Sequence, residues 1–195
     1  MNWSELRQAY RVFLENPSQG ILHIIAAGQQ SHWQRWVTAR LAQQATPLAH
    51  TMIDINLDYL SQLPEDSLGG AYAKHLLSQG FDPAAFVTSN QYDWVEQRLA
   101  LSHDVHHVMT GFNSTPVGEF GLAAFVLLQY RDLLNVFVLS HLPWFMVGHI
   151  MLAPQAIASV IRGIRQGLVC KPIFAYPFEA NWHKPLIEVR QELGL

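Results

Sequence analysis

Two histidines four residues apart, with an aspartate beside the first, are the residues of this sequence best suited to metal chemistry. If the surrounding residues form a helix, His103 and His107 lie one turn apart on one face, and Asp104 lies on the same side. Gly111 is suited to end that helix, which brings Glu119 into the first turn of the next one. Imidazoles and carboxylates are common ligands of first-row divalent metals. The spacing therefore predicts a divalent metal site, for which zinc is the leading candidate and iron or magnesium are alternatives.

A helix over residues 92–110 must carry the histidine pair. Arg98 suits the exposed side of this helix. His106 points to a different part of the helix surface, where we expect it to be exposed or to support the metal ligands from outside. The helix is therefore predicted to present one metal-binding face and a separate polar face.

Capping residues mark the neighbouring helices. Ser114 or Thr115 can cap the helix that carries the glutamate, and Pro116 suits its first turn. Ser67 can cap an earlier helix, for which Gly80 is a good C-terminal stop. No strand pair, glycine-rich phosphate loop or repeat is apparent. The predicted fold is all-α: a single compact domain over residues 1–195, with about seven to nine helices and an apolar groove that binds lipid.

Composition limits the partners. Charged residues make up 14% of the chain, against about 25% in typical soluble domains, whereas apolar residues make up 50%. We therefore expect apolar surface that meets a lipid, a membrane or another protein. The net charge of −3 and the absence of a Lys or Arg run argue against nucleic acid as a partner. Cys170, the single cysteine, excludes an internal disulfide and fits a reducing cytoplasm.

A long stretch without charge raises the question of a membrane span. The 29 residues between Asp132 and Arg162 contain no Asp, Glu, Lys or Arg. Prolines and polar residues divide this stretch into 133–142 and 144–153, each about half of the roughly 20 residues that a transmembrane helix needs. We expect these segments to be core helices, or apolar helices that line a lipid pocket and rest on a membrane.

The metal motif resembles the HDxxH-x11-E motif of the Coq4 family of coenzyme Q biosynthesis proteins. Two further stretches are similar to this family: Ser67 to Ala73, followed by Asp82-Pro83, and Lys171 to Phe174. The resemblance covers about residues 64–195. The region before it shows little of the usual N-terminal pattern of the family.

The resemblance implies a role in ubiquinone assembly, with zinc at the motif and a prenyl tail in an apolar channel. The family is associated with replacing the C1 carboxylate of the ring by a hydroxyl, and with holding other biosynthetic enzymes together at the membrane. A Lewis-acid metal can stabilise the negative charge that develops as carbon dioxide leaves. In this hypothesis Asp104 and Glu119 are the catalytic candidates, and Asp104 orients a metal-bound water or accepts a proton.

Two other functional classes stay open. The protein can be a lipid-binding scaffold without chemistry, because four protein ligands would saturate a structural zinc. It can also be a metallohydrolase, since the motif is similar to HExxH, although the aspartate at the position of the general base has a shorter reach.

The partners expected from this interpretation are a prenylated quinone precursor or another isoprenoid lipid, a membrane surface, other quinone-biosynthesis proteins and a second copy of the chain in a homodimer.

Residues 1–10 lack the basic start and apolar core of a signal peptide, and they lack the Arg-rich composition of a transit peptide. This indicates a bacterial cytoplasmic protein or an already mature chain. With the membrane surface among the expected partners, we expect the protein to be cytoplasmic and peripheral to the inner membrane.

Overall fold

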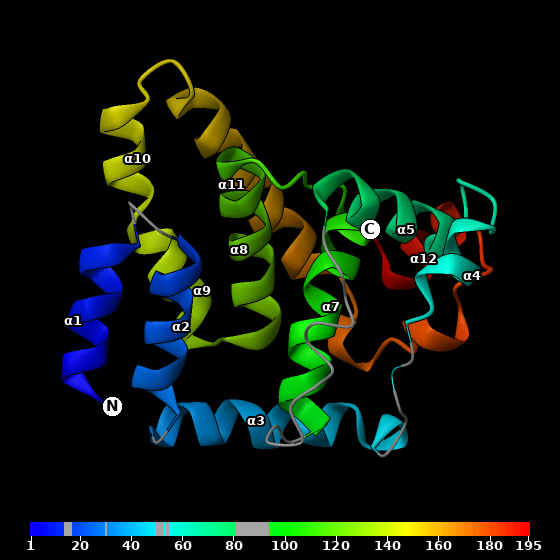
Figure 1. Ribbon diagram of the computed structural model, residues 1–195, viewed down its shortest axis with the longest axis horizontal. Coiled ribbons are helices and arrows are strands. Elements are labelled where there is room, and N and C mark those ends of the chain that lie inside the picture. The colour runs from blue at the N-terminus through cyan, green and yellow to red at the C-terminus, as the bar shows by residue number, and fades with distance from the viewer. Residues whose placement is uncertain (14–16, 30, 50–52, 54, 81–93) are drawn as a thin grey trace.

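The computed structural model describes residues 1–13, 17–29, 31–49, 53, 55–80 and 94–195 (Figure 1). Within these ranges the regular elements are helices, apart from one isolated bridge between Ser67 and Pro185, and the predicted all-α class is confirmed. The α-helices are α1 (Trp3–Val12), α2 (Pro17–Gly28), α3 (His32–Gln44), α4 (Leu57–Ser61), α5 (Leu68–Gln79), α7 (Trp94–Thr110), α8 (Pro116–Tyr130), α9 (Leu133–Ser140), α10 (Leu142–Gly148), α11 (Ala153–Val169) and α12 (Leu186–Leu193). Short 3-10 helices are η1 (Thr46–Leu48), η2 (Ile173–Ala175) and η3 (Phe178–Ala180). The Asp82-Pro83 pair lies outside the described residues.

Helices α8 and α11 pack along each other at the centre of the molecule (Figure 1). Glycines allow this close approach: a Cβ atom added to Gly163 would collide with the carbonyl group of Gly121, and one added to Gly167 would lie 3.0 Å from the carbonyl oxygen of Phe125. Helices α1, α2 and α9 lie on one side of this pair, and α4, α5 and α12 lie on the other. The pair therefore forms the middle of the fold, and the start of α8 brings Glu119 to α7.

Within the part of the chain that the structure describes, two apolar cores stabilise this arrangement. The larger core joins α3, α5, α7, α8 and the C-terminal segment, and its fully buried side chains include Tyr72, Phe125 and Phe174. The smaller core packs Ala9 and Ile24 against Phe137 of α9. Because full burial of a large apolar side chain stabilises a fold by about 1.5–3 kcal/mol, each core fixes the helices around it.

The predicted caps are confirmed. The Ser67 hydroxyl accepts a hydrogen bond from the backbone N–H of Gly70 at 3.0 Å, and Gly80 has a φ of +65°, in the left-handed region. Thr115, one of the two candidates, caps α8 by accepting from the N–H of Gly118 at 3.3 Å, with Pro116 as first residue of that helix. These local signals fix both ends of α5 and the start of α8, the helix that carries Glu119.

The predicted exposure of Arg98 is wrong, because its side chain is only 2% exposed. Its guanidinium donates to the carbonyl oxygens of Phe174 at 2.9 Å and Tyr176 at 2.6 Å, and to a carboxylate oxygen of Glu179 at 2.9 Å. It also lies 4.5 Å from the ring centre of Phe178. Burial is tolerated because these acceptors replace water. Arg98 thereby joins α7 to the segment after α11.

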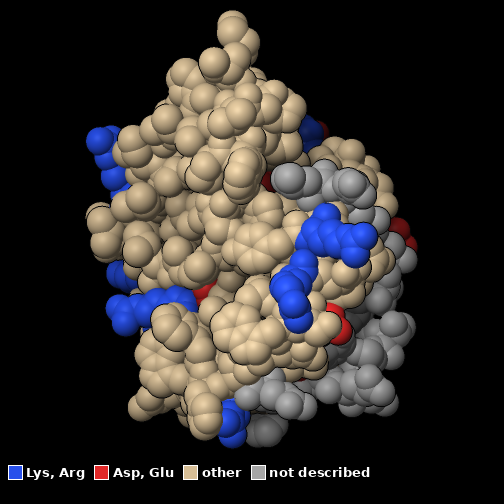
Figure 2. Space-filling model, turned by 90° about the vertical axis from the view of Figure 1, so that its left-hand side faces the viewer, with Lys and Arg blue, Asp and Glu red and all other residues tan. Residues whose placement is uncertain are grey.

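The division of the uncharged stretch into short helices is confirmed by α9 and α10. None of the helices in the described ranges is long and apolar enough to cross a membrane. Helix α10 and the turn before α11 expose large apolar side chains, which are Trp144 (67%), Val147 (81%), Ile150 (76%) and Met151 (84%). Charged residues are sparse over the upper half of the face that includes α10, as Figure 2 shows.

Candidate metal centre

The candidate ligands come from two helices that meet at a tight connection. His103, Asp104 and His107 lie on α7, and Glu119 lies in the first turn of α8. Gly111, with a φ of +72°, ends α7 and turns the chain toward α8. The His107 side chain is 1% exposed, whereas those of His103 and Glu119 are 51% and 38% exposed. The centre is thus anchored at His107 and open to solvent on the side of His103.

The side-chain atoms that could bind a metal converge. Nε2 of His107 lies 3.1 Å from Oε1 of Glu119 and 3.3 Å from Nε2 of His103, and Nε2 of His103 lies 3.9 Å from Oε2 of Glu119. Ligands about 2.0–2.1 Å from a tetrahedral zinc are separated by roughly 3.3 Å. Potential ligand atoms of His103, Asp104 and His107 lie within 4.8 Å of one another. The donors therefore fit a divalent metal, with Asp104 able to reach the group from α7.

The orientation of His107 suits a ligand. Its Nδ1 lies 3.0 Å from the carbonyl oxygen of Phe112, to which only a protonated Nδ1 can donate. In neutral His107, Nε2 then carries the lone pair, directed toward His103 and Glu119. A hydrogen bond from the second ring nitrogen to a carbonyl oxygen is usual for metal-binding histidines.

The charges of the site favour a cation among the carboxylates. Burial alone would lower the pKa of His107, but the hydrogen bond and charge of Glu119 and the Phe112 carbonyl raise the pKa above its ordinary value. Burial would raise the pKa of Glu119, yet His107 and His103 outweigh it, so that this pKa is lowered. Burial of His103 lowers its pKa, although part of its side chain stays open to solvent. The centre thus stabilises ionised carboxylates around a proton or a metal ion.

His75 of α5 is a member of this centre that the sequence did not indicate. Its Nε2 lies 3.3 Å from Oδ1 of Asp104, and its ring stacks on that of His107 with 5.3 Å between the ring centres. Burial would raise the pKa of Asp104, but the hydrogen bond with His75 and the neighbouring imidazoles lower it overall. His75 and Asp104 are 29 residues apart in the chain, so no local spacing connects them.

His106 is buried, contrary to the alternative of an exposed side chain. It is 3% exposed, and the Tyr130 hydroxyl lies 3.0 Å from its Nε2. Burial lowers the pKa of His106 to about 3, which keeps the ring neutral and lets Tyr130 donate the hydrogen bond. His106 therefore packs in the interior beside the centre and supplies no ligand toward the other histidines.

Two arginines hold the C-terminal end of α7. Arg162 of α11 donates to the carbonyl oxygen of Thr110 at 2.7 Å, and its guanidinium lies 4.2 Å from the ring centre of Phe112. Arg190 of α12 donates to the carbonyl oxygens of Met109 and Val108 at 2.9 and 3.0 Å. Cations at a helix C-terminus interact favourably with its free carbonyl groups. These bonds fix the end of the helix that carries His107.

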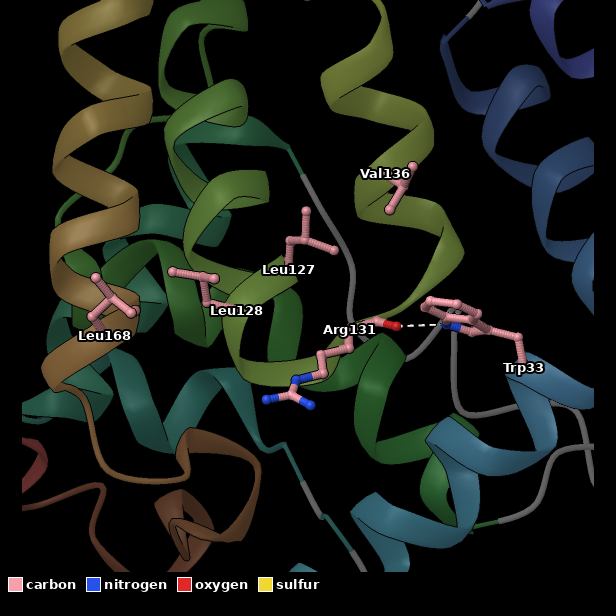
Figure 3. A pocket seen from close by; sticks show the side chains of 7 residues that line it. Trp33, Leu127, Leu128, Arg131, Val136 and Leu168 are labelled. Atoms are coloured by element: carbon pink, nitrogen blue, oxygen red, sulfur yellow. Dashed lines mark hydrogen bonds between the residues drawn. The ribbon is translucent and has the colours of Figure 1, made fainter.

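An apolar pocket lies elsewhere, near the C-terminal ends of α8 and α11 (Figure 3). Its cavity has a volume of about 440 Å³, and its lining consists of Trp33, Leu127, Leu128, Arg131, Val136, Gly167 and Leu168. The Trp33 indole donates to the Arg131 carbonyl oxygen at 2.6 Å. Leu128 follows Glu119 by nine residues, which is about 180° around the helix at 3.6 residues per turn. The pocket therefore opens on a different face from the metal centre.

The fold and the site define a helical protein with a candidate divalent metal centre between two consecutive helices. The family model described as Coenzyme Q (ubiquinone) biosynthesis protein Coq4 matches residues 41–195. The chain belongs to the Coq4 family. This match starts before the resemblance over residues 64–195 and leaves α1, α2 and the first part of α3 outside it.

Curated relatives agree with this family, and a solved structure has the same fold. The chain is 30% identical over 155 residues to the mitochondrial ubiquinone biosynthesis protein coq4 of Aspergillus terreus, covering 74% of this chain and 52% of the relative. It is 28% identical over 160 residues to that of Komagataella phaffii, covering 74% and 49%. The chain spans about half the length of these relatives. A crystal structure from Nostoc punctiforme, described as a candidate ubiquinone biosynthesis protein, has the same fold, with a TM-score of 0.82, 24% identity, and coverage of 99% of this chain and 98% of that chain.

Proposed function

We propose that this protein acts in ubiquinone biosynthesis as a metal-dependent enzyme on a prenylated aromatic ring. The observation that carries this proposal is the convergence of His103, His107 and Glu119, whose nearest nitrogen and oxygen atoms are 3.1 to 3.9 Å apart. In this proposal these three residues are the permanent ligands. Asp104 is the fourth and exchangeable one, because its short side chain shares a helix face with the two histidines.

Zinc is the first candidate for the metal, because the donors are imidazoles and carboxylates in a compact group. Iron is the main alternative, since two histidines with one carboxylate also suit ferrous iron, and magnesium is the third. A bound divalent metal would supply a Lewis acid that stabilises negative charge on a carboxylate or phenolate oxygen of the ring, as in removal of the C1 carboxylate.

The residues of the chain would orient the ring and handle the proton. The open side at His103 gives a planar ring acid access to the centre, and the buried His107 keeps the ligands in place. The Asp104 carboxylate, whose pKa is lowered overall, is ionised and can accept a proton from the ring hydroxyl or from water. Glu119 joins α8 to α7 through its contact with His107 and so fixes the position of one helix relative to the other.

A membrane surface is the proposed source of the prenylated substrate. The apolar side chains exposed on α10 and before α11 support peripheral binding, because such a patch can enter the boundary of the acyl chains. The prenyl tail would then stay in an apolar groove or in the lipid while the ring reaches the metal. A homodimer and contacts with other quinone-biosynthesis proteins belong to the same proposal, since apolar patches of this kind also serve protein partners.

The test combines metal analysis with complementation of a strain that lacks this step. Freshly purified protein should hold about one divalent ion per chain, which should be lost in His103→Ala and His107→Ala. His183→Ala is the matched control, because it removes an exposed histidine outside the centre. Wild-type protein without metal would contradict the proposal.

A non-catalytic scaffold is the second candidate, and one observation favours it: with Asp104, the centre has four protein donors, which could saturate a structural zinc. The variant Asp104→Asn separates the two. If the centre is catalytic, this variant should keep its metal and fold and should fail to restore quinone, with accumulation of the prenylated ring acid measured by mass spectrometry. Full restoration of quinone by a folded, metal-bound Asp104→Asn protein would favour the scaffold.

A further inference from the structure

A third helix reaches the centre through His75. Helix α5 is fixed at its start, where the backbone N–H groups of Leu68 and Gly69 donate to the carbonyl oxygens of Lys184 and Trp182, each at 2.8 Å. Tyr72, one turn before His75, stacks on Trp182 with 5.2 Å between ring centres. Because these contacts fix α5, the position of the His75 ring relative to α7 is fixed as well.

His75 meets the centre in two ways. Its Nε2 lies 3.3 Å from Oδ1 of Asp104, and an ionised carboxylate can only accept, so Nε2 donates. Its ring lies almost parallel to that of His107, at an interplanar angle of 24°. The His75 side chain is only 15% exposed, so little water competes for the carboxylate oxygen.

The hydrogen bond restricts what Asp104 can do. One carboxylate oxygen is occupied by His75, so the carboxylate cannot turn freely to bind a metal through both oxygens. Potential ligand atoms of Asp104, His103 and His107 lie within 4.8 Å of one another. The Asp104 side chain, which is 22% exposed, is therefore held beside the two histidines with one oxygen still free of His75.

We propose that His75 is a positioning residue, which acts through Asp104 and keeps its carboxylate next to the metal without closing the last coordination position. The inference rests on the metal site proposed above. Hydrogen bonds of this kind orient groups around metals, and their loss typically costs about 10- to 100-fold in metal affinity or activity. Here the loss falls on activity, because His103, His107 and Glu119 remain in place when His75 is changed.

Two substitutions separate the two contacts of His75. The variant His75→Phe keeps an aromatic ring beside His107 and removes the donor. The variant His75→Gln removes the ring and keeps an amide donor near the position of Nε2. If His75→Phe folds poorly, His75→Asn replaces it. The Asn side chain carries the same amide as Gln but is one methylene shorter, so its amide does not reach Asp104.

The probe is Co²⁺, whose visible absorption depends on the number and geometry of its ligands. In His75→Phe the freed Asp104 should close the open position, so the Co²⁺ spectrum should shift toward higher coordination while Co²⁺ affinity does not fall. His75→Gln should keep the wild-type spectrum. Quinone production in the complemented strain should fall by about 10- to 100-fold in His75→Phe.

The double variant His75→Phe/Asp104→Asn tests whether His75 acts through Asp104. In the Asp104→Asn background, His75→Phe should cause no further spectral change, because the group that it frees is gone. A wild-type spectrum in His75→Phe, or an equal change in both backgrounds, would overturn the inference. So would a loss of Co²⁺ affinity that follows the melting temperature, since that indicates a structural role. Wild type that binds no Co²⁺ overturns the metal site and this inference together, whereas wild type that binds Co²⁺ but restores no quinone overturns only the proposed function.

Discussion

Removal of the metal should lower the melting temperature of the protein, and Glu119→Gln should abolish most of that difference. His103 and His107 lie on the same helix, so a metal held by them alone would stabilise only α7. As the proposed ligand on α8, Glu119 would extend the metal site to that helix, and through it to the central pair with α11. A ligand that binds only the folded chain stabilises it by about 2.7 kcal/mol at 100 times its dissociation constant.

The expected shift follows from the size of the chain. At 195 residues, each kcal/mol corresponds to about 2–4 °C, so saturating zinc should raise the melting temperature by roughly 5–10 °C. If Glu119→Gln weakens binding about 100-fold, the same zinc concentration contributes only about 0.4 kcal/mol, or roughly 1–2 °C. The assay is calorimetry in zinc and in chelator. Glu188→Gln is the matched control, because Glu188 lies exposed in the first turn of α12. Equal melting temperatures in zinc and chelator, or an undiminished shift in Glu119→Gln, would refute the reasoning.

Three further predictions concern the buried Arg98, the apolar side chains exposed on α10 and before α11, and the pH dependence of stability. Arg98→Met should destabilise the fold by about 3–5 kcal/mol in denaturant titrations, because it leaves the buried carboxylate of Glu179 without its cation, and adding Glu179→Gln should recover part of this loss. Val147→Glu and Met151→Glu should each weaken binding to anionic lipid vesicles in flotation assays with an unchanged melting temperature, and carbonate should release the wild type from membranes. Glu119 raises the pKa of His107, so in chelator this pair stabilises the fold below the ordinary histidine pKa and loses that effect as the pH rises through the raised value. Zinc binding should show the opposite trend and weaken as the pH falls. The measurement is the rise in melting temperature that zinc causes, followed between about pH 5.5 and 8.

Local chemistry made part of this structure predictable. Ser67, Gly80, Thr115 and Pro116 act on backbone groups within a few residues, so their types alone indicate where helices begin and end. The same holds for His103 and His107, because helix periodicity places residues four apart on one face. The metal motif is predictable for this reason: its members lie within one helix, one short connection and one further turn.

Contacts between distant segments were not predictable. Arg98 reads as a solvent-facing residue of an amphipathic helix, and its carbonyl and carboxylate partners lie 76 to 81 residues further along the chain. His75 likewise meets Asp104 only after α5 and α7 have packed. In both cases a polar side chain is tolerated inside because partners from another element satisfy it, and spacing within one helix carries no information about those partners.

The uneven exposure of the proposed ligands favours the proposed catalytic centre over a structural one. A structural zinc site is closed by its ligands, whereas a catalytic site keeps a position for substrate. Here His107 is 1% exposed, while His103 at 51% and Glu119 at 38% face solvent. A small aromatic acid such as 4-hydroxybenzoate should therefore enter the site and change the visible spectrum of the Co²⁺-loaded protein. Benzyl alcohol, which has the ring without the carboxylate, is the control and should leave the spectrum unchanged. If saturating ring acid also leaves the spectrum unchanged, the coordination sphere is closed, and the metal serves to lock α7 to α8.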